Sequence, residues 1–253
     1  MHKLSVIICC YNERDTIARI IAESKAVDLG PDWDRELIVV DNCSTDGTRE
    51  ILQQLGDPDL RIFYHDVNKG KGASIRTGIS KMTGSYFFIQ DADSEYDPRE
   101  QRKFTDYAAR TGAAAVFGSR VLGGEVRSKY LRTLLANRLL TLLTNLLFGG
   151  KLTDVATASK MVRADVAQAL NLTCSGFDLD FELPNKILLS GHQIEEIPIN
   201  YDPRTYAEGK KIRGSDAVKA VLTMLRDRLG LSPARKPEPT KPAVGADNIN
   251  VNS

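Results

Sequence analysis

Four short apolar runs, separated by segments with helical spacing, are the feature that most constrains how this chain can fold. The runs cover residues 4–10, 36–41, 61–66 and 85–91, and each ends in a polar cluster. A short apolar run bounded by polar residues and rich in β-branched side chains is typical of a buried strand. Strands that alternate with helices predict an α/β fold, in which a mostly parallel sheet is covered by helices on both faces.

The polar clusters that follow these strands are the most informative part of the sequence for function. In parallel sheets of this kind, ligands bind beyond the carboxyl ends of the strands. We therefore expect the polar segments to meet at one edge of the sheet and to form a binding site. In chain order these segments read YNE, DNCSTD, NKGKG and QDADSE.

The segment QDADSEYDP, residues 90–98, places three carboxylates directly after the fourth run. Taken alone, such a segment is typical of a surface turn before a proline. Its position after a buried strand, with the small Ala92 between Asp91 and Asp93, favours a ligand-binding role instead. Mg²⁺ is usually bound by a few carboxylates together with substrate phosphates. Asp91 and Asp93 are suited to hold a metal and a nucleotide sugar, and Glu95 could supply a further oxygen.

The glycine-rich segment NKGKGASIRTG, residues 68–78, resembles a phosphate-binding loop at first sight. It lacks the complete P-loop spacing, and we therefore reject a Walker-type site. Its glycines would still allow the backbone to approach a ligand closely.

The second half of the chain combines a further strand with two amphipathic helices. Residues 113–119 indicate a strand, and residues 131–148 form a long leucine-rich helical pattern that contains Arg132 and Arg138. These arginines make the pattern too polar to span a bilayer, so it is either a core helix or a helix that lies on a membrane surface. Residues 217–230 predict a second amphipathic helix.

We predict one catalytic domain at residues 1–230, with a nucleotide-binding half at about 1–120 and an acceptor-binding half at about 121–230. From residue 231 onward the chain is rich in proline and poor in aromatic residues. This composition predicts a disordered tail over residues 231–253.

Composition narrows the class of protein. The formal net charge of +1 gives no support for a nucleic-acid partner. The four cysteines form no CxxC pair, which indicates a reducing compartment. Because neither a secretory signal nor a clean apolar stretch of about 20 residues is evident, we expect a cytoplasmic protein that contacts the membrane peripherally.

The chain also resembles the inverting glycosyltransferases of family 2, which have the GT-A (nucleotide-diphospho-sugar transferase) fold. The likeness is strongest to the polyprenyl-phosphate glycosyltransferases, a group that includes dolichyl-phosphate mannose synthase. It covers residues 4 to about 230. The matching segments, in order, are VIICCYNE (6–13), IVVDNCSTDGT (38–48), NKGKGASIRTG (68–78), QDADSEYDP (90–98), GSR (118–120), DVATASKMVR (154–163) and RTYAEGK (204–210).

The resemblance implies a role for individual residues. For the nucleotide sugar it implies Tyr11, Glu13, Asp41, Lys71, Asp91, Ala92, Asp93 and Arg120. For a Mg²⁺ or Mn²⁺ ion it implies Asp91, Asp93 and Glu95. For catalysis it implies Asp91, Asp93, Arg120 and Arg204. For the acceptor and its phosphate it implies Arg132, Asp154, Lys160, Arg204 and Lys210.

The chain departs from the family pattern at several positions. Cys9 stands where the first motif usually has proline, and Asn42 replaces the second carboxylate of the second motif. Ala158 stands where a glycine is common, and Ala207 and Gly209 stand where the dolichyl enzymes favour Gly and Ser. These differences bear on the identity of the base and the sugar more than on the reaction class.

The resemblance implies transfer of a sugar from a UDP- or GDP-sugar, with inversion at the anomeric carbon. A phosphomonoester acceptor has a second pKa of about 6 and needs no strong base, which favours a polyprenyl phosphate at the inner face of the membrane. The alternative acceptor is a soluble or growing glycan, which would require an aspartate base such as Asp180, although Asp180 could equally cap a helix. A sugar nucleotidyltransferase would need a glycine-rich N-terminal signature that is missing. A catalytically silent binding protein is opposed by the intact Asp91, Asp93 and Arg120.

Overall fold

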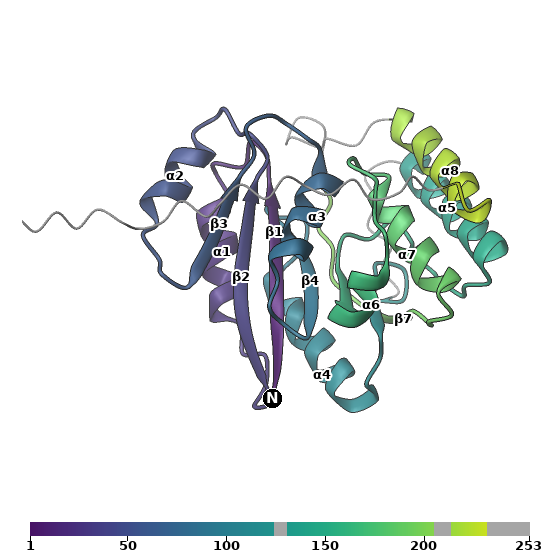
Figure 1. Cartoon of the computed structure of the whole chain (residues 1–253), viewed down its shortest axis with the longest axis horizontal. Coiled ribbons are helices and arrows are strands. Elements are labelled where there is room, and N and C mark those ends of the chain that lie inside the picture. The colour runs from purple at the N-terminus through teal and green to yellow at the C-terminus, as the bar shows by residue number, and fades with distance from the viewer. Residues whose placement is uncertain (124–130, 205–213, 232–253) are drawn as a thin grey trace, which may run out of the picture.

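The computed structural model describes residues 1–123, 131–204 and 214–231 of the chain. Seven strands form one mixed sheet flanked by helices (Figure 1). The strands are β1 (His2–Cys10), β2 (Trp33–Asp41), β3 (Leu60–Tyr64), β4 (Tyr86–Asp91), β5 (Ala115–Ser119), β6 (Lys160–Arg163) and β7 (Glu195–Pro198). Their order across the sheet is β3-β2-β1-β4-β6-β5-β7, in which β6 runs antiparallel to β4 and β5, and the other neighbours are parallel.

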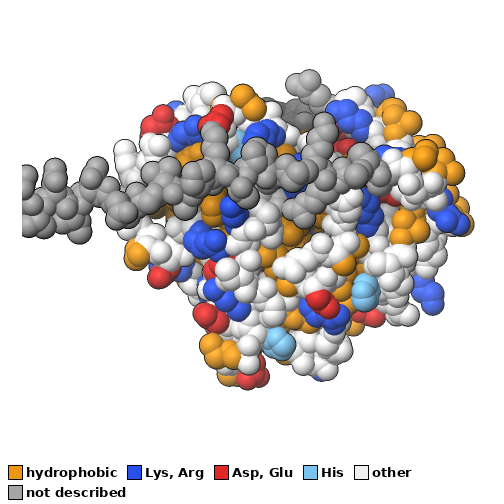
Figure 2. Space-filling view, viewed as in Figure 1, with side chains coloured by type: hydrophobic (Ala, Val, Ile, Leu, Met, Phe, Trp, Pro, Cys, Tyr) orange, Lys and Arg blue, Asp and Glu red, His pale blue; other side chains and the backbone are white. Residues whose placement is uncertain are grey.

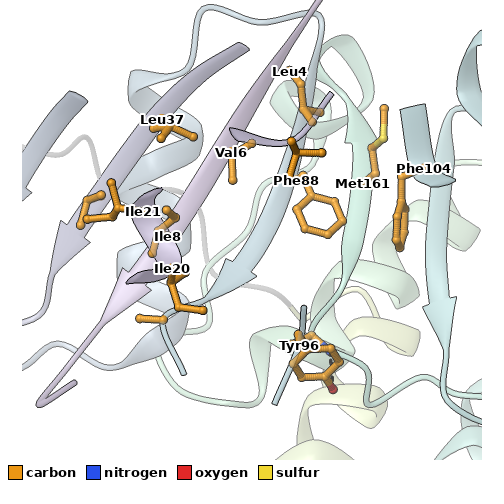
Figure 3. Close-up of a cluster of buried hydrophobic side chains, with 14 of the residues drawn as sticks. Leu4, Val6, Ile8, Ile20, Ile21, Leu37, Phe88, Tyr96, Phe104 and Met161 are labelled. Atoms are coloured by element: carbon orange, nitrogen blue, oxygen red, sulfur yellow. Dashed lines mark hydrogen bonds between the residues drawn. The ribbon is translucent and has the colours of Figure 1, made fainter. Parts of the chain in front are cut away.

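The helices are α1 (Ile17–Ala26), α2 (Thr48–Gln54), α3 (Lys71–Lys81), α4 (Gln101–Thr111), α5 (Leu131–Phe148), α6 (Ala164–Ala169), α7 (Leu179–Leu189) and α8 (Gly214–Arg228), with a short 3₁₀ turn at Pro98–Glu100. They cover both faces of the sheet because alternate residues of a strand point to opposite faces. Ile8 of β1 packs into a core with α1 and α4, whereas Ile7 packs into a second core with α3, α6 and α7. In the first core, Phe88 of β4 meets Phe104 of α4 with ring centroids 4.9 Å apart (Figure 3).

A third apolar cluster lies between α5 and α8, which pack side by side at the end of the molecule opposite α2 (Figure 1). Leu140 of α5 and Met224 of α8 are buried in it. Both helices also expose a row of large apolar side chains, and Figure 2 shows hydrophobic atoms gathered at this end beside Lys and Arg side chains. We call these exposed side chains the leucine face: Leu135, Leu139, Leu142 and Leu146 of α5, Val218, Leu222 and Leu225 of α8, and Leu229 directly after α8.

For the 131–148 segment, the structure confirms packing in a core, while contact with a membrane surface stays a prediction. Its inner side contributes to a core, and its outer side is apolar and exposed. Within the described residues, no helix has the length and apolarity that crossing a membrane requires.

The strands and helices expected from the sequence are present with small shifts of their ends. β2 begins at Trp33, and α3 already begins at Lys71, inside the glycine-rich segment. Sequence analysis did not identify β6 and β7, which have four residues each. β6 lies between β4 and β5, and β7 is the edge strand beside β5. The segment 232–253, predicted to be disordered, lies outside the described residues.

Candidate active site

The polar segments that follow the first four strands meet at one edge of the sheet, as predicted. The strand register places Cys10 opposite Asp41 and Cys9 opposite Asp91, so β2, β1 and β4 end side by side. A cavity of about 900 Å³ lies there, between these strand ends, α5 and residues 201–204. Its size is in the range of small-molecule sites.

Arg204 connects the segments that follow β1 and β4. Its guanidinium donates to the two carboxylate oxygens of Glu13 at 3.2 and 3.3 Å and to Oδ2 of Asp93 at 2.5 Å. Its backbone N–H donates to Oε1 of Glu95 at 2.7 Å, and the hydroxyl of Tyr201 donates to Oε2 at 3.1 Å. These contacts attach residues 201–204 to the edge of the sheet.

Two lysines flank a second pair of carboxylates in the cavity. Lys71 Nζ lies 2.8 Å from Oδ1 of Asp91 and 3.8 Å from Oδ2 of Asp180. The fully buried Lys160 donates to Oδ1 of Asp180 at 3.2 Å. Burial alone would raise the pKa of Asp180, but the charges of Lys160 and Lys71 outweigh burial and hold the pKa below its ordinary value. Asp180 is the second residue of α7 and is not its cap.

Arg120, directly after β5, is fixed by a bidentate ion pair. Its Nε and Nη2 donate to the two oxygens of Asp154 at 2.6 and 2.7 Å. Nη1 donates to the hydroxyl of Tyr96 at 3.2 Å, and the guanidinium lies 5.0 Å from the ring centre of Tyr201. A planar guanidinium with this many contacts has one orientation, so Arg120 is a rigid part of the cavity wall.

The wall formed by the segments after β2 and β3 presents amide groups. Asn42 donates from Nδ2 to Oδ1 of Asn68 at 2.9 Å, and its own Oδ1 lies 3.0 Å from Nδ1 of the buried His65. Asp41 lies behind this wall, where its Oδ2 accepts from Nε of Arg49 at 2.7 Å. The amide that replaces the usual carboxylate is thus held in a network within the chain.

The glycines of the NKGKG segment are required by packing within the chain. Gly70 has a φ of +90°, and a Cβ at this position would overlap the carbonyl of Ser175. A Cβ on Gly72 would lie 2.8 Å from the carbonyl oxygens of Cys174 and Gly176. The loop at residues 174–176 approaches the backbone of both glycines. Gly70 also lines the cavity, so the close approach of a ligand to it stays a prediction.

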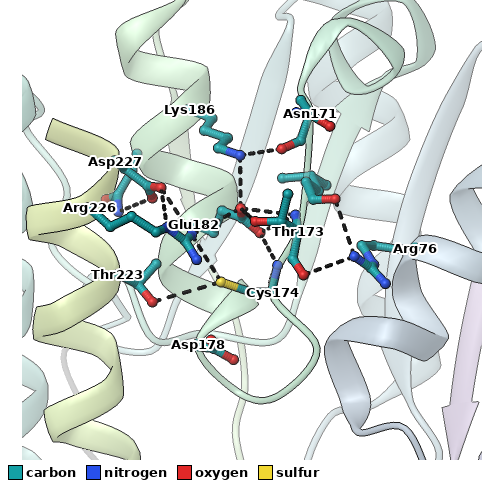
Figure 4. Close-up of polar contacts among 12 residues, drawn as sticks. Arg76, Asn171, Thr173, Cys174, Asp178, Glu182, Lys186, Thr223, Arg226 and Asp227 are labelled. Atoms are coloured by element: carbon teal, nitrogen blue, oxygen red, sulfur yellow. Dashed lines mark hydrogen bonds and ion pairs between the residues drawn. The ribbon is translucent and has the colours of Figure 1, made fainter. Parts of the chain in front are cut away.

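That loop is held by the buried Glu182 of α7 (Figure 4). Its carboxylate accepts from the backbone N–H of Cys174 at 2.8 Å and pairs with Lys186 at 2.8 Å and with Arg226 of α8 at 3.1 Å. The network connects α7 and α8 to the loop that packs on the start of α3. It therefore supports the position of Lys71 in the cavity.

The charge of the cavity bears on cofactor binding. Six carboxylates and four cationic side chains line it, which leaves an excess of two negative charges. Burial, with a contribution from Asp91, raises the pKa of Asp93 to about 7 despite the opposing charge of Arg204. A cation close to Asp93 would favour its ionised form. An anionic ligand such as a nucleotide diphosphate also requires positive charge in such a cavity.

The donor groups of Asp91 and Asp93 fit a hard divalent ion, because Mg²⁺ prefers carboxylate oxygens together with substrate phosphates. Among the residues that the structure describes, no three His, Cys, Asp or Glu side chains are grouped to hold a metal by themselves. Both oxygens of Glu95 already accept hydrogen bonds from residues 201–204. Its role as a metal ligand stays a prediction.

Most of the predicted site residues line the cavity: Tyr11, Glu13, Lys71, Asp91, Ala92, Asp93, Glu95, Arg120, Asp154 and Arg204. Asp41 and Lys160 are fully buried behind the lining, and Arg132 is exposed on α5 outside it. Lys210 lies outside the described residues. The contacts of each residue with a substrate stay predictions.

Sequence analysis missed the cation that α5 brings to the cavity. Arg138 lines it together with Leu134, Asn137 and Thr141. These positions are three or four residues apart and share one side of the helix. The recurring polar residues of the 131–148 segment were the available signal.

Comparison with known proteins agrees with this architecture. The crystal structure of glucosyl-3-phosphoglycerate synthase from Mycobacterium tuberculosis in complex with Mg²⁺ and UDP superposes with a TM-score of 0.61 at 20% sequence identity, covering 90% of this chain and 80% of that one. The likeness shows that the sheet and its helices have the GT-A fold.

Two curated relatives are similar in sequence. The low-salt glycan biosynthesis hexosyltransferase Agl6 of Haloferax volcanii is 28% identical over 204 residues, which cover 79% of this chain and 48% of the relative. The dolichol-phosphate mannosyltransferase of Pyrococcus furiosus is 26% identical over 216 residues, which cover 82% of this chain and 59% of the relative. The chain thus spans about half to three fifths of the length of these relatives.

The model of the family described as glycosyl transferase family 2 matches residues 5–170. This region contains β1 to β6 and most of the charged residues that line the cavity. The chain therefore belongs to glycosyl transferase family 2.

Proposed function

We propose that this glycosyltransferase moves a sugar from a UDP- or GDP-sugar to the phosphate of a polyprenyl phosphate, at a membrane surface and with inversion at the anomeric carbon. The position of α5 carries the proposal. One side of this helix lines the cavity, and the adjacent side exposes the leucine face. An acceptor with a phosphate head and an apolar chain can contact both surfaces at once.

The charged residues near Asp180 favour a phosphate acceptor over a hydroxyl acceptor. A general base works best when its pKa lies near the working pH. Lys160 and Lys71 hold the pKa of Asp180 below its ordinary value of 3.8, which makes it a weak proton acceptor. A phosphate dianion requires no proton removal before it attacks.

In the proposed reaction, an acceptor phosphate oxygen forms a bond to the anomeric carbon while the bond from that carbon to the nucleotide diphosphate breaks. The departing diphosphate keeps the electron pair. Arg120 and Arg204 both line the cavity and would bind phosphate oxygens of the leaving group. A Mg²⁺ or Mn²⁺ ion held by Asp91 and Asp93 would supply further charge stabilisation to the leaving group.

The donor end of the cavity would hold the nucleotide. Tyr11, Asn42 and Asn68 line the wall beyond β1, β2 and β3, and these aromatic and amide groups are suited to a base. One curated relative is named for a dolichol-phosphate acceptor, and one similar structure was solved with Mg²⁺ and UDP. Both names support the proposal for this chain.

A donor and acceptor screen tests this function directly. Purified protein with Mg²⁺ or Mn²⁺ would be incubated with a panel of UDP- and GDP-sugars and with short polyprenyl phosphates, matched polyprenyl alcohols or soluble glycans. We expect mass spectrometry to show a glycosylated polyprenyl phosphate and no product from the alcohol. Transfer only to soluble glycans would contradict the proposed acceptor, and the Asp93→Ala variant serves as the inactive control.

A further inference from the structure

The cationic side chains that line the cavity differ in how far they are already paired. Lys71 forms an ion pair with Asp91, and Arg120 forms one with Asp154. Arg204 is shared between two carboxylates. Arg138 is the exception, because no carboxylate of the described residues pairs with its guanidinium. Among the described residues, it is thus the cavity-lining cation whose charge no carboxylate offsets.

The place of Arg138 on α5 is also distinctive. It lies four residues after Leu134 and three before Thr141, both of which line the cavity. It also lies three residues after Leu135 and four before Leu142, which are 55% and 53% exposed. Residues at these spacings are neighbours on a helix surface. Arg138 consequently stands at the border between the cavity and the leucine face.

We propose that Arg138 binds the phosphate of the acceptor and that the apolar chain of the acceptor then runs along the leucine face. This inference rests on the proposed function and assigns the acceptor's phosphate to one residue. A guanidinium binds a phosphate through two parallel hydrogen bonds. Within the described residues the charge of Arg138 is not offset by a carboxylate, whereas Arg120 and Arg204 share their charge with carboxylates of the chain.

The same geometry argues against Arg132 in this role. Arg132 lies six residues before Arg138, which places it about 120° away around the helix. Both arginines are exposed, but only Arg138 contributes to the cavity lining. The resemblance implies Arg132 for the acceptor phosphate, so substitutions of Arg132 and of Arg138 distinguish the two assignments.

Steady-state kinetics with a short polyprenyl phosphate in detergent would test the proposal. For Arg138→Ala we expect the acceptor KM to rise roughly 10- to 100-fold, as for loss of a charge-assisted hydrogen-bonding pair, with the donor KM changed less than about twofold. Arg138→Lys should recover part of the loss. The exposed Arg110 of α4 provides the matched control, and Arg110→Ala should leave both constants unchanged. A parallel rise of both KM values, or a larger acceptor effect for Arg132→Ala, would overturn the assignment.

Binding assays separate this inference from the proposed function. Wild-type protein should bind a fluorescent polyprenyl phosphate more tightly than the matching alcohol, and Arg138→Ala should lose this preference. If the wild type shows no preference, the proposed acceptor is wrong and the inference falls with it. If the variant keeps the full preference, only the role of Arg138 is wrong. Loss of binding to phosphatidylglycerol vesicles but not to the acceptor would assign Arg138 to lipid headgroups and also overturn the inference.

Discussion

Replacing Asp180 by asparagine distinguishes a phosphate acceptor from a hydroxyl acceptor. Asparagine keeps an oxygen that can accept from Lys160, whose Nζ also donates to the backbone carbonyl of residue 180 at 2.9 Å. The substitution removes the negative charge that lies 3.8 Å from Lys71, but Lys71 retains its 2.8 Å contact with Asp91. The geometry of the cavity should therefore largely survive.

The expected magnitudes differ widely between the two mechanisms. A general base contributes about 10²- to 10⁴-fold to the rate, so its removal would reduce kcat by that factor. If the acceptor is a phosphate, Asp180 only positions the two lysines, and we expect kcat to fall by about tenfold or less. The free energy of unfolding should be affected more strongly than kcat. Lys160 is fully buried, and the loss of one partner of a buried ion pair costs about 3–5 kcal/mol.

The assay is kcat with a polyprenyl phosphate, measured well below the melting temperature of the variant, with urea unfolding in parallel. Asp165→Asn, on the exposed start of α6, is a suitable control because Arg163 is the one ion-pair partner of Asp165 among the described residues. A kcat loss of a hundredfold or more in folded Asp180→Asn protein, with the donor KM unchanged, would refute the reasoning. It would show that Asp180 takes part in the chemical step and does more than position the two lysines.

Three further outcomes follow from the packing and the surface. Gly72→Ala would place a Cβ 2.8 Å from two carbonyl oxygens and should cost about 1–3 kcal/mol in urea unfolding. Gly123→Ala, whose nearest described neighbours lie 3.9 Å away, should be nearly neutral. Equal effects of the two substitutions would show that the loop at residues 174–176 can move to accommodate the added methyl group. Glu182→Gln removes the carboxylate that Lys186 and Arg226 share, although Arg226 keeps its 3.0 Å ion pair with Asp227. The substitution should cost about 3 kcal/mol at neutral pH. Because folding lowers the pKa of Glu182 from 4.5, the stabilisation by its charge is present above that value and is lost as the pH falls through the pKa of the folded state. The Glu182→Gln variant should therefore lose less stability than the wild type between pH 6 and pH 3. Parallel curves of unfolding free energy against pH would disprove the role of the charge. The double substitution Leu139→Ser and Leu146→Ser should weaken binding to anionic vesicles by about tenfold or more with unchanged unfolding, and unaltered flotation with vesicles would exclude the leucine face as the membrane contact.

The local sequence was sufficient to predict the strands and helices of the first half of the chain and the polar segments that follow the strands. β1, β2 and β4 could be identified because a parallel strand that is covered on both faces is a continuous apolar run. The position of Asp91 and Asp93 followed from the same rule, since the exit of such a strand must turn toward solvent. Resemblance then supplied Arg120 and Arg204, which no local pattern near the acidic segment could have indicated.

Tertiary structure alone decided which charges are paired and which side of a helix faces the cavity. Asp180 and Lys160 are 20 residues apart, and Arg204 reaches Glu13 across 191 residues; such pairs depend on the sheet order, which helical or strand periodicity does not encode. The glycines of NKGKG have the same explanation, because the loop that needs their missing side chains comes from residues 174–176. Sequence periodicity showed that residues 131–148 form an amphipathic helix, but only its packing against α8 and the cavity distinguished Arg138 from Arg132.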